Sequence, residues 1–153
     1  MLDLDWFKFL VNKSLAKIGL AVSLSLVFSV SCSKKNNNNS GYIIFENGLM
    51  VKTLSEGKGR KIDLGDVVVV NYVGKLEDGT VFDSSYERGY PIKYKVGESG
   101  YIEGWKLGII GMKVDEKREI IIPPSLGYGE RAMPDIPPNS KLIFEVKIEE
   151  IVN

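Results

Sequence analysis

The feature that most constrains this fold is one short helical pattern in a chain whose other segments are typical of strands. Residues 102–112 carry apolar side chains at i, i+3, i+7 and i+10, which are Ile102, Trp105, Ile109 and Met112. This spacing places all four on one face of a helix. Because Gly104 and Gly108 each weaken a helix by about 1 kcal/mol relative to Ala, the helix is stable only when that face is buried. We expect a sheet to cover it, with Trp105 at the floor of any pocket left open.

From residue 49 onward the rest of the chain is typical of strands and loops. Strand patterns occupy the segments 49–54, 66–77, 81–85, 92–96, 118–122 and 141–152. Asp78 and Gly79 are typical of a two-residue hairpin turn between the second and third segments. The pattern predicts an α+β domain in which a strongly twisted antiparallel sheet of about five strands wraps around one short helix.

Alternation along two of these segments predicts which side chains face the helix. The inward set is Val68, Val70 and Tyr72 in the long strand and Leu142, Phe144, Val146 and Ile148 in the last strand. Residues 86–91 are predicted as a loop or bulge. Residues 123–140, which contain five prolines, are predicted as a long loop of the kind that is often functional.

The length and composition of the chain predict one folded domain. A chain of 153 residues with 44% hydrophobic content suffices for one compact domain, which we place at 48–153. Residues 33–41 are polar, low in complexity and without an apolar face to bury. The segment 32–47 is therefore predicted to be a flexible tether.

Residues 1–31 have the pattern of a secretory signal. A lysine-containing start precedes an apolar run at 18–30, which is short for a membrane span of roughly 20 residues. The segment Phe28-Ser29-Val30-Ser31-Cys32 resembles a bacterial lipoprotein signal. The resemblance implies that the protein crosses the inner membrane and that Cys32 is lipidated, which would anchor it facing the periplasm or the cell surface. The alternative is a lone thiol at the end of an ordinary signal or uncleaved anchor.

Composition excludes several classes of chemistry. The chain has no histidine and only one cysteine, which removes His-based acid–base catalysis, His metal ligands and a Cys-based zinc site. Its serines lack a histidine base. We therefore expect no metal and no cofactor. Lys plus Arg and Asp plus Glu both number 20, so no basic excess indicates a nucleic-acid partner.

The chain instead places aromatic side chains at the ends of strands and at loop mouths. They are Tyr72, Phe82, Tyr94, Tyr101, Trp105, Tyr128 and Phe144. Any one of them, taken alone, is better explained as a core residue. Together they exceed what a core of this size requires, and they predict an apolar cleft with a few polar tips.

Several motifs around these aromatics carry a family resemblance. They are Val70-Asn71-Tyr72-Val73-Gly74-Lys75-Leu76-Glu77-Asp78-Gly79, Val81-Phe82-Asp83-Ser84-Ser85, Gly104-Trp105, Tyr128-Gly129, Ile136-Pro137-Pro138-Asn139 and Leu142-Ile143-Phe144-Glu145-Val146. In this order and spacing they resemble the FKBP family, the peptidyl-prolyl cis-trans isomerases that bind rapamycin-type macrolides. The resemblance covers about residues 49–152.

The resemblance implies a site that holds an X-Pro segment of a protein substrate. It implies catalytic roles for Tyr72, Phe82, Asp83, Trp105, Tyr128 and Phe144. It implies substrate contacts for Arg88, Ile92, Tyr94, Tyr101, Ile102 and Ile136. Among these, Ile102 would offer its backbone N–H to a ligand carbonyl. Asp83 would lie near Tyr72 and pair with Arg88, although that pair has an alternative role as an ion pair that only pins the loop.

The function implied by the resemblance is acceleration of X-Pro rotation in exported or unfolded polypeptides by a monomer that also binds rapamycin-type macrolides. Ile92 stands where many members have an aromatic, which is expected to lower affinity. The alternative function is a lipoprotein that binds proline-containing peptides or surface partners without turnover.

Overall fold

The structure, a computed structural model, describes residues 36–37 and 41–152. The predicted signal at 1–31 and the predicted lipidation site Cys32 lie outside the described residues. Within the described part of the chain, no helix is long and apolar enough to cross a membrane.

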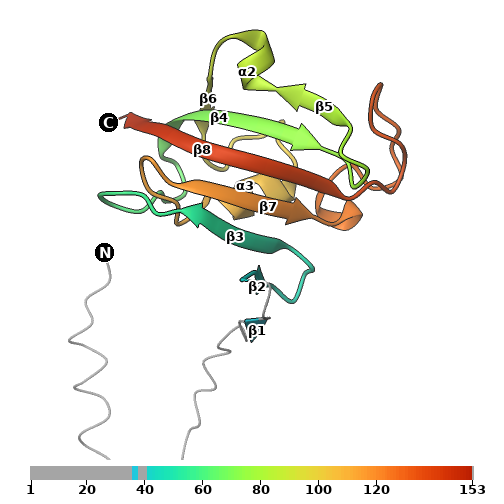
Figure 1. The fold of residues 1–153 in the computed structure, drawn as a ribbon, viewed down its shortest axis with the longest axis horizontal. Helices are drawn as coiled ribbons and strands as arrows, with labels where there is room; N and C mark the ends of the chain where they lie inside the picture. Colours follow the sequence, from blue (N-terminus) through green and yellow to red (C-terminus); the bar gives the residue numbers. More distant parts are fainter. Residues whose placement is uncertain (1–35, 38–40, 153) are drawn as a thin grey trace, which may run out of the picture. The chain divides into compact units, whose positions relative to one another are not determined.

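One antiparallel sheet of eight strands forms the framework of the described residues (Figure 1). The strands are β1 (Asn36–Asn37), β2 (Ile43–Ile44), β3 (Met50–Ser55), β4 (Val67–Lys75), β5 (Val81–Ser84), β6 (Ile92–Lys95), β7 (Lys117–Ile122) and β8 (Leu142–Val152). Their order is β1-β2-β3-β7-β8-β4-β5, and β6 also pairs with β4. The predicted α+β class is confirmed. The sheet has more strands than the expected five: the six predicted segments all form strands, and β1 and β2, which have two residues each, extend one edge.

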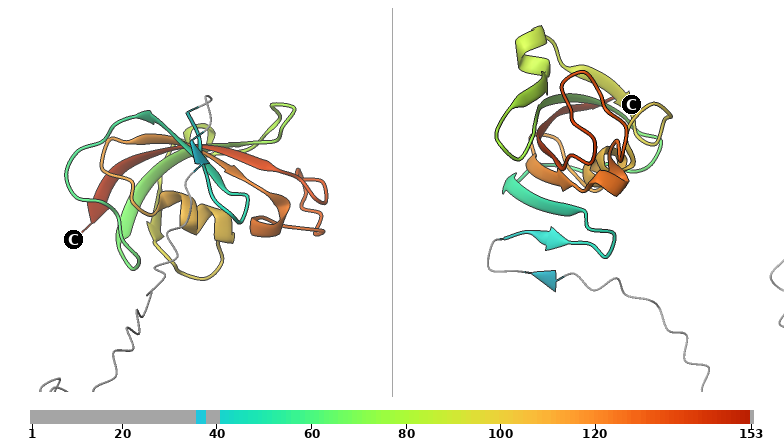
Figure 2. Two further views of the ribbon diagram at one scale, coloured as in Figure 1. Left: turned by 90° about the horizontal axis from the view of Figure 1, so that it is seen from below. Right: turned by 90° about the vertical axis from the view of Figure 1, so that its right-hand side faces the viewer.

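The sheet curves around one helix, α3 (Glu103–Ile109), as the view from below in Figure 2 shows. The inward side chains of β4 and β8 are those predicted from alternation, and all are at most 7% exposed: Val68, Val70, Tyr72, Leu142, Phe144, Val146 and Ile148. Trp105, Ile109 and Met112 are equally buried beneath them. The helix ends at Ile109, so Met112 lies beyond it, and Ile102 is its partly buried N-cap. These side chains and the inner face of the sheet still form one core.

Two glycines allow α3 to lie directly against β7. A Cβ atom on Gly104 would come within 2.3 Å of the Ile122 side chain, and one on Gly108 within 2.6 Å of Ile120. Both distances are shorter than any normal van der Waals contact, so no larger residue fits without movement. From the sequence these glycines only weaken a helix. In the fold, the same residues set how closely the helix approaches the sheet.

A buried ion pair fixes the C-terminal end of α3. Arg118 pairs with Glu116 at 2.7 Å, and the Glu116 residue is 3% exposed. The guanidinium of Arg118 also donates to the backbone oxygens of Gly108 at 2.8 Å and Ile110 at 3.2 Å. These carbonyls end the helix and would otherwise lack partners. Arg118 therefore ties α3 to β7 by polar contacts next to the apolar ones.

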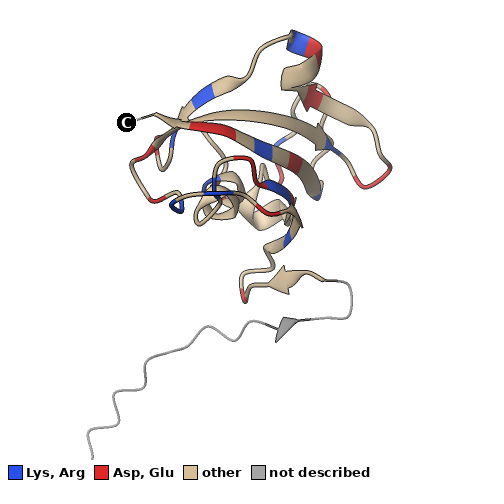
Figure 3. Cartoon of the chain, turned by 60° about the vertical axis from the view of Figure 1, so that its left-hand side comes forward, with Lys and Arg blue, Asp and Glu red and all other residues tan. Residues whose placement is uncertain are grey.

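The outer face of the sheet carries charges of both signs side by side (Figure 3). Lys75 pairs with Glu145 across β4 and β8 at 2.6 Å, and Lys147 pairs with Glu149 at 2.6 Å. Because one face is covered by α3 and the other is polar, the sheet has the alternation expected of an antiparallel sheet that is solvated on one side.

The ordered domain begins before the predicted boundary at residue 48. Ile43–Ile44 pairs with Met50 and Val51 of β3, and Phe45 packs against the core. A turn closes this hairpin, in which the N–H of Phe45 donates to the oxygen of Leu49 at 2.9 Å. Within the segment 32–47, which was predicted as a flexible tether, β2 therefore pairs with the sheet, and Ile43 and Phe45 pack against the core.

A second short helix, α2 (Ser85–Arg88), replaces part of the loop predicted at 86–91. The Ser84 side chain accepts a hydrogen bond from the Glu87 N–H at 3.3 Å, and Gly89 ends the turn with φ 82°. The sequence did contain this information, since Ser followed three residues later by Glu and then by Gly is typical of a capped helical turn.

Candidate functional site

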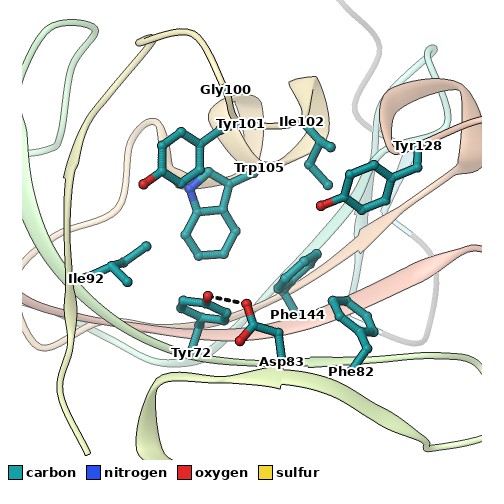
Figure 4. A pocket seen from close by; sticks show the side chains of 10 residues that line it. All are labelled: Tyr72, Phe82, Asp83, Ile92, Gly100, Tyr101, Ile102, Trp105, Tyr128 and Phe144. Atoms are coloured by element: carbon teal, nitrogen blue, oxygen red, sulfur yellow. Dashed lines mark hydrogen bonds between the residues drawn. The ribbon is translucent and has the colours of Figure 1, made fainter. Parts of the chain in front are cut away.

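An open cleft of about 180 Å³ lies over the N-terminal half of α3 (Figure 4). Strands β4, β5, β6 and β8, the start of α3 and the long loop before β8 all contribute to its walls. The lining residues are Tyr72, Phe82, Asp83, Ile92, Gly100, Tyr101, Ile102, Trp105, Tyr128 and Phe144. Nine of these ten are residues that the sequence placed in the site.

The indole of Trp105 is held between two other aromatic rings. The ring of Tyr72 lies 5.1 Å from it at an interplanar angle of 70°, and the ring of Phe144 lies 5.2 Å away at 69°. Both are edge-to-face arrangements, which are favourable for aromatic pairs. Since Trp105 is only 3% exposed, its position is set by packing rather than by solvent. The cleft therefore has a rigid floor.

A glycine in β4 allows two phenylalanines to form one wall. The rings of Phe82 and Phe144 meet edge-to-face with centroids 5.5 Å apart. A Cβ atom on Gly74 would lie 2.7 Å from the Phe82 ring and 2.9 Å from the Phe144 ring. Both rings therefore cross the space above Gly74, and a side chain at this position would push them into the cleft. The sequence motif contains Gly74, but its role became visible only in the structure.

A polar group of three side chains lies beside the apolar wall. The Tyr72 hydroxyl donates to Asp83 at 2.5 Å and accepts from Arg88 at 2.9 Å, and Arg88 also pairs with Asp83. The Arg88 guanidinium lies 5.3 Å from the centroid of the Tyr72 ring. Burial, followed by the hydrogen bond to Asp83, raises the pKa of Tyr72 to about 12. Tyr72 is therefore a neutral phenol at physiological pH.

These features match one protein family. The model of the FKBP-type peptidyl-prolyl cis-trans isomerase family matches residues 58–149, which is more than half of the chain. The chain belongs to this family. An FK506-binding protein 2 of Yarrowia lipolytica is 50% identical over 107 residues, which cover 69% of this chain and 74% of that protein.

Other relatives and structures agree with this assignment. An FK506-binding protein 4 of Aspergillus fumigatus is 48% identical over 104 residues, which cover 68% of this chain but only 21% of that protein. The chain thus spans about a fifth of the length of such relatives. FkpA from Escherichia coli matches with a TM-score of 0.68 and 39% identity over 74% of this chain and 53% of that one. AtFKBP13 matches with a TM-score of 0.68 and 36% identity, over 72% of this chain and 98% of that one.

Three residues predicted to contact substrate lie outside the lining of this FKBP-type cleft. Tyr94 is fully buried behind it, where its ring packs against Tyr101 at 4.4 Å and Trp105 at 6.2 Å. Ile136 is 6% exposed and packs in the core. Arg88 reaches the site only through Tyr72 and Asp83. For Tyr94 and Ile136 the sequence placed an apolar residue near the site but did not reveal on which side of the wall it lies.

One lining residue, Gly100, was not predicted from the sequence. A glycine before a helix has no side chain that would identify it as part of a site. Ile102 is the N-cap of α3, and Trp105 follows it in the first turn. The side chain of Ile102 lines the cleft. Its backbone N–H is not a donor in the turn, loop and cap hydrogen bonds of the described residues.

The site contains one unpaired buried donor and no cluster of metal-binding side chains. The indole N–H of Trp105 is buried without a hydrogen-bond partner among the described residues. The ring of Tyr94 lies edge-to-face with the indole ring of Trp105, at an interplanar angle of 66°. Within residues 36–37 and 41–152, no group of three or more Asp, Glu, Cys or His side chains is placed to hold a metal ion. The functional groups that the cleft offers are therefore rings, hydroxyls, one carboxylate and backbone donors.

Proposed function

We propose that this chain accelerates cis–trans rotation of X-Pro bonds in polypeptides. The observation that carries the proposal is the open aromatic cleft above Trp105, with a volume of about 180 Å³, in a chain of the isomerase family. That volume suits one proline ring and its neighbouring amide.

The cleft has the physical properties that amide rotation requires. An amide resists rotation with a barrier of about 18–20 kcal/mol because resonance gives its C–N bond partial double-bond character. In the twisted state that resonance is lost, and the C–N unit is less polar than the planar amide. A cleft whose walls are mostly apolar rings favours the twisted state over the planar, well-hydrated one. No bond is made or broken, so no nucleophile, base or metal is required.

Two groups are suited to hold the substrate while its bond rotates. The hydroxyl of Tyr128 points into the cleft from the loop before β8 (Figure 4). The backbone N–H of Ile102 lies at the start of α3, and Ile102 lines the cleft. We propose that Tyr128 and Ile102 bind substrate carbonyl oxygens, and that Tyr72, Phe82, Asp83, Trp105 and Phe144 shape the surface on which the proline ring rests.

The same cleft is proposed to bind macrolides. Several relatives are named as FK506-binding proteins, and one is 50% identical to this chain. Ile92 lines the cleft as a short aliphatic side chain. We expect FK506 or rapamycin to compete with a proline peptide, with lower affinity than in family members that carry an aromatic ring at this position.

We further propose that the domain works outside the inner membrane as a monomer on a lipid anchor. The support is the apolar run at 18–30, the Cys32 that closely follows it, and the polar stretch after Cys32. Expression in a bacterial host followed by mass spectrometry of the mature N-terminus tests this proposal. A lipidated Cys32 is expected, and a Cys32→Ser variant should leave the membrane fraction. An unmodified thiol, or unchanged membrane association of the variant, would refute the anchor.

The proposed reaction is tested by measuring exchange in X-Pro peptides with magnetisation-exchange NMR or a protease-coupled assay. The chain should accelerate exchange, and Phe82→Ala should lower kcat/KM by about tenfold because half of the phenylalanine wall is removed. Phe82 is partly exposed, so the variant should remain folded. If the unmodified chain binds the peptides without accelerating exchange, the proposal fails and the alternative, a binding protein without turnover, replaces it.

A further inference from the structure

The two ends of the cleft differ in their hydrogen-bonding groups (Figure 4). One end is formed by Phe82, Phe144 and Tyr128, whose hydroxyl points inward. The other end is formed by Tyr101 and Ile92. Ile92 has no polar side-chain atom, so the hydroxyl of Tyr101 is the hydrogen-bonding side-chain group at that end.

The ring of Tyr101 rests on a fixed support. It packs against Tyr94 with ring centroids 4.4 Å apart and an interplanar angle of 55°. Tyr94 is fully buried, and its hydroxyl accepts a hydrogen bond from the N–H of Gly97 at 3.1 Å. A tyrosine has only two side-chain torsions, so a packed ring presents its hydroxyl at little further cost in conformational entropy. Tyr101 therefore holds a polar group at the rim in a defined place.

The hydroxyl of Tyr101 is available for a ligand. Two nearby tyrosines use their hydroxyls within the protein, Tyr72 with Asp83 and Arg88, and Tyr94 with Gly97. Tyr101 takes part in none of the side-chain hydrogen bonds of the described residues. It is also not among their buried unpaired groups, which consist of the Trp105 indole alone, so solvent reaches it. Partial burial, together with the charge of Glu98, raises the pKa of Tyr101, which keeps the phenol a donor at neutral pH.

We propose that Tyr101 determines which proline segments the cleft prefers, by hydrogen-bonding a hydroxyl or amide side chain on the residue that flanks the proline at the Ile92 end. The substrate class is then X-Pro segments with Ser, Thr, Asn or Gln at one flanking position. This inference rests on the proposed isomerase function. The hydrogen bond is remote from the rotating amide and is the same in the planar and twisted states, so it contributes to KM and not to kcat.

A peptide series with Tyr101→Phe tests the proposal. The series places Ser, Asn, Val or Leu on either side of one proline, and kcat and KM are measured for each peptide by NMR exchange. The native chain should prefer Ser and Asn over Val and Leu at one flank. Tyr101→Phe, which keeps the ring and its contact with Tyr94, should raise KM for the preferred peptides by about threefold to tenfold. Values for the Val and Leu peptides should not change.

Two further variants make the result specific. Tyr86→Phe removes a phenol hydroxyl from a residue that is 56% exposed and outside the cleft lining, and it should leave every peptide unchanged. Tyr101→Leu should abolish the same preference, and circular dichroism checks that it is folded. Equal effects of Tyr101→Phe on polar and apolar peptides, or no flank preference in the native chain, would overturn the inference while leaving the isomerase proposal standing. A native chain that accelerates no peptide would overturn both.

Discussion

The two sides of α3 are built in opposite ways. On the side of Gly104 and Gly108 the helix backbone meets the isoleucines of β7 so closely that a single methyl group would not fit. On the side of Trp105 the sheet stands off and leaves an open cleft of about 180 Å³. A close-packed interface and a binding site thus share one helix of seven residues.

The difference shows how a short helix can hold a cleft open. An isolated helix of this length is unstable, so its position must come from tertiary contacts. The glycine side and the Arg118 contacts with the backbone oxygens of Gly108 and Ile110 fix that position. We call the side of Gly104 and Gly108 the closed side of α3 and the side of Trp105 the open side. Because interiors are densely packed, a shift of the helix on the closed side should also move the indole of Trp105 on the open side. The following changes test this dependence, from the largest expected effect to the smallest.

Trp105→Ala removes both a buried core side chain and the floor of the cleft, and it should have the largest effect. The side chain is 3% exposed and touches the rings of Tyr72 and Phe144. Its removal should lower the free energy of unfolding by about 3–5 kcal/mol, measured by urea denaturation with far-UV circular dichroism. Exchange activity should fall to background because the floor of the cleft is lost. A stable variant with native activity would show that the indole is neither floor nor core.

Gly104→Ala changes only the closed side, where α3 meets β7, and should have the next largest effect. A Cβ 2.3 Å from Ile122 forces a shift that costs about 1–3 kcal/mol, offset by about 1 kcal/mol of improved helix propensity. Stability should therefore fall by up to about 2 kcal/mol. The comparison of the two sides predicts that activity falls as well, although Gly104 does not line the cleft.

Leu107→Ala is the matched control for that experiment. Leu107 lies on the same helix but is 37% exposed, so the change should affect neither stability nor activity strongly. If Gly104→Ala lost stability but kept full activity at a temperature where it is folded, the closed side would not be setting the geometry of the open side.

Asp83→Asn changes only the open side and should leave the free energy of unfolding nearly unchanged. The pair with Arg88 is partly exposed, and such pairs contribute roughly 0–1 kcal/mol. The Tyr72 hydroxyl would lose a charged acceptor, so we expect kcat/KM to fall by about twofold to tenfold. Arg88→Lys, which keeps the charge but not the fork geometry, separates the two roles of the pair. Loss of activity in Asp83→Asn alone would indicate direct action of the carboxylate, and equal loss in both would indicate that the pair positions the loop.

The same contrast between the two sides explains what the sequence could and could not predict. Alternation in β4 and β8 identified Val68, Tyr72 and Phe144 as inward, because periodicity of two follows directly from strand geometry. The family motifs then identified most of the cleft lining. These features depend on what each side chain is, and that information is present in the sequence.

The sequence could not reveal where distant segments of the chain pack closely against each other. Gly74, Gly104 and Gly108 act through what stands opposite them, and that depends on the register between distant segments. Tyr94 and Ile136 were placed at the site by the family resemblance, and only the fold shows that their side chains are buried outside the cleft lining. The strand β2 was missed because two residues are too few to show periodicity.

The response to pH should be the smallest effect near neutrality and should appear only in alkali. The pKa of Tyr72 is raised to about 12 by burial and by Asp83, and the chain has no histidine, so exchange activity should be flat between about pH 6 and pH 9. Because the folded-state pKa lies above the ordinary 10.0, the stability linked to the neutral phenol is complete below pH 10 and is lost as pH rises through about 12. A hydrogen bond to Glu119 raises the pKa of Tyr42 to about 12 as well. Tyr72→Phe and Tyr42→Phe should therefore each reduce the loss of folding stability at high pH. This is measured as the urea midpoint at several pH values. Only Tyr72→Phe should also alter exchange activity, because only that hydroxyl lies on the open side, and an activity inflection near neutral pH would mean that another group titrates in the cleft.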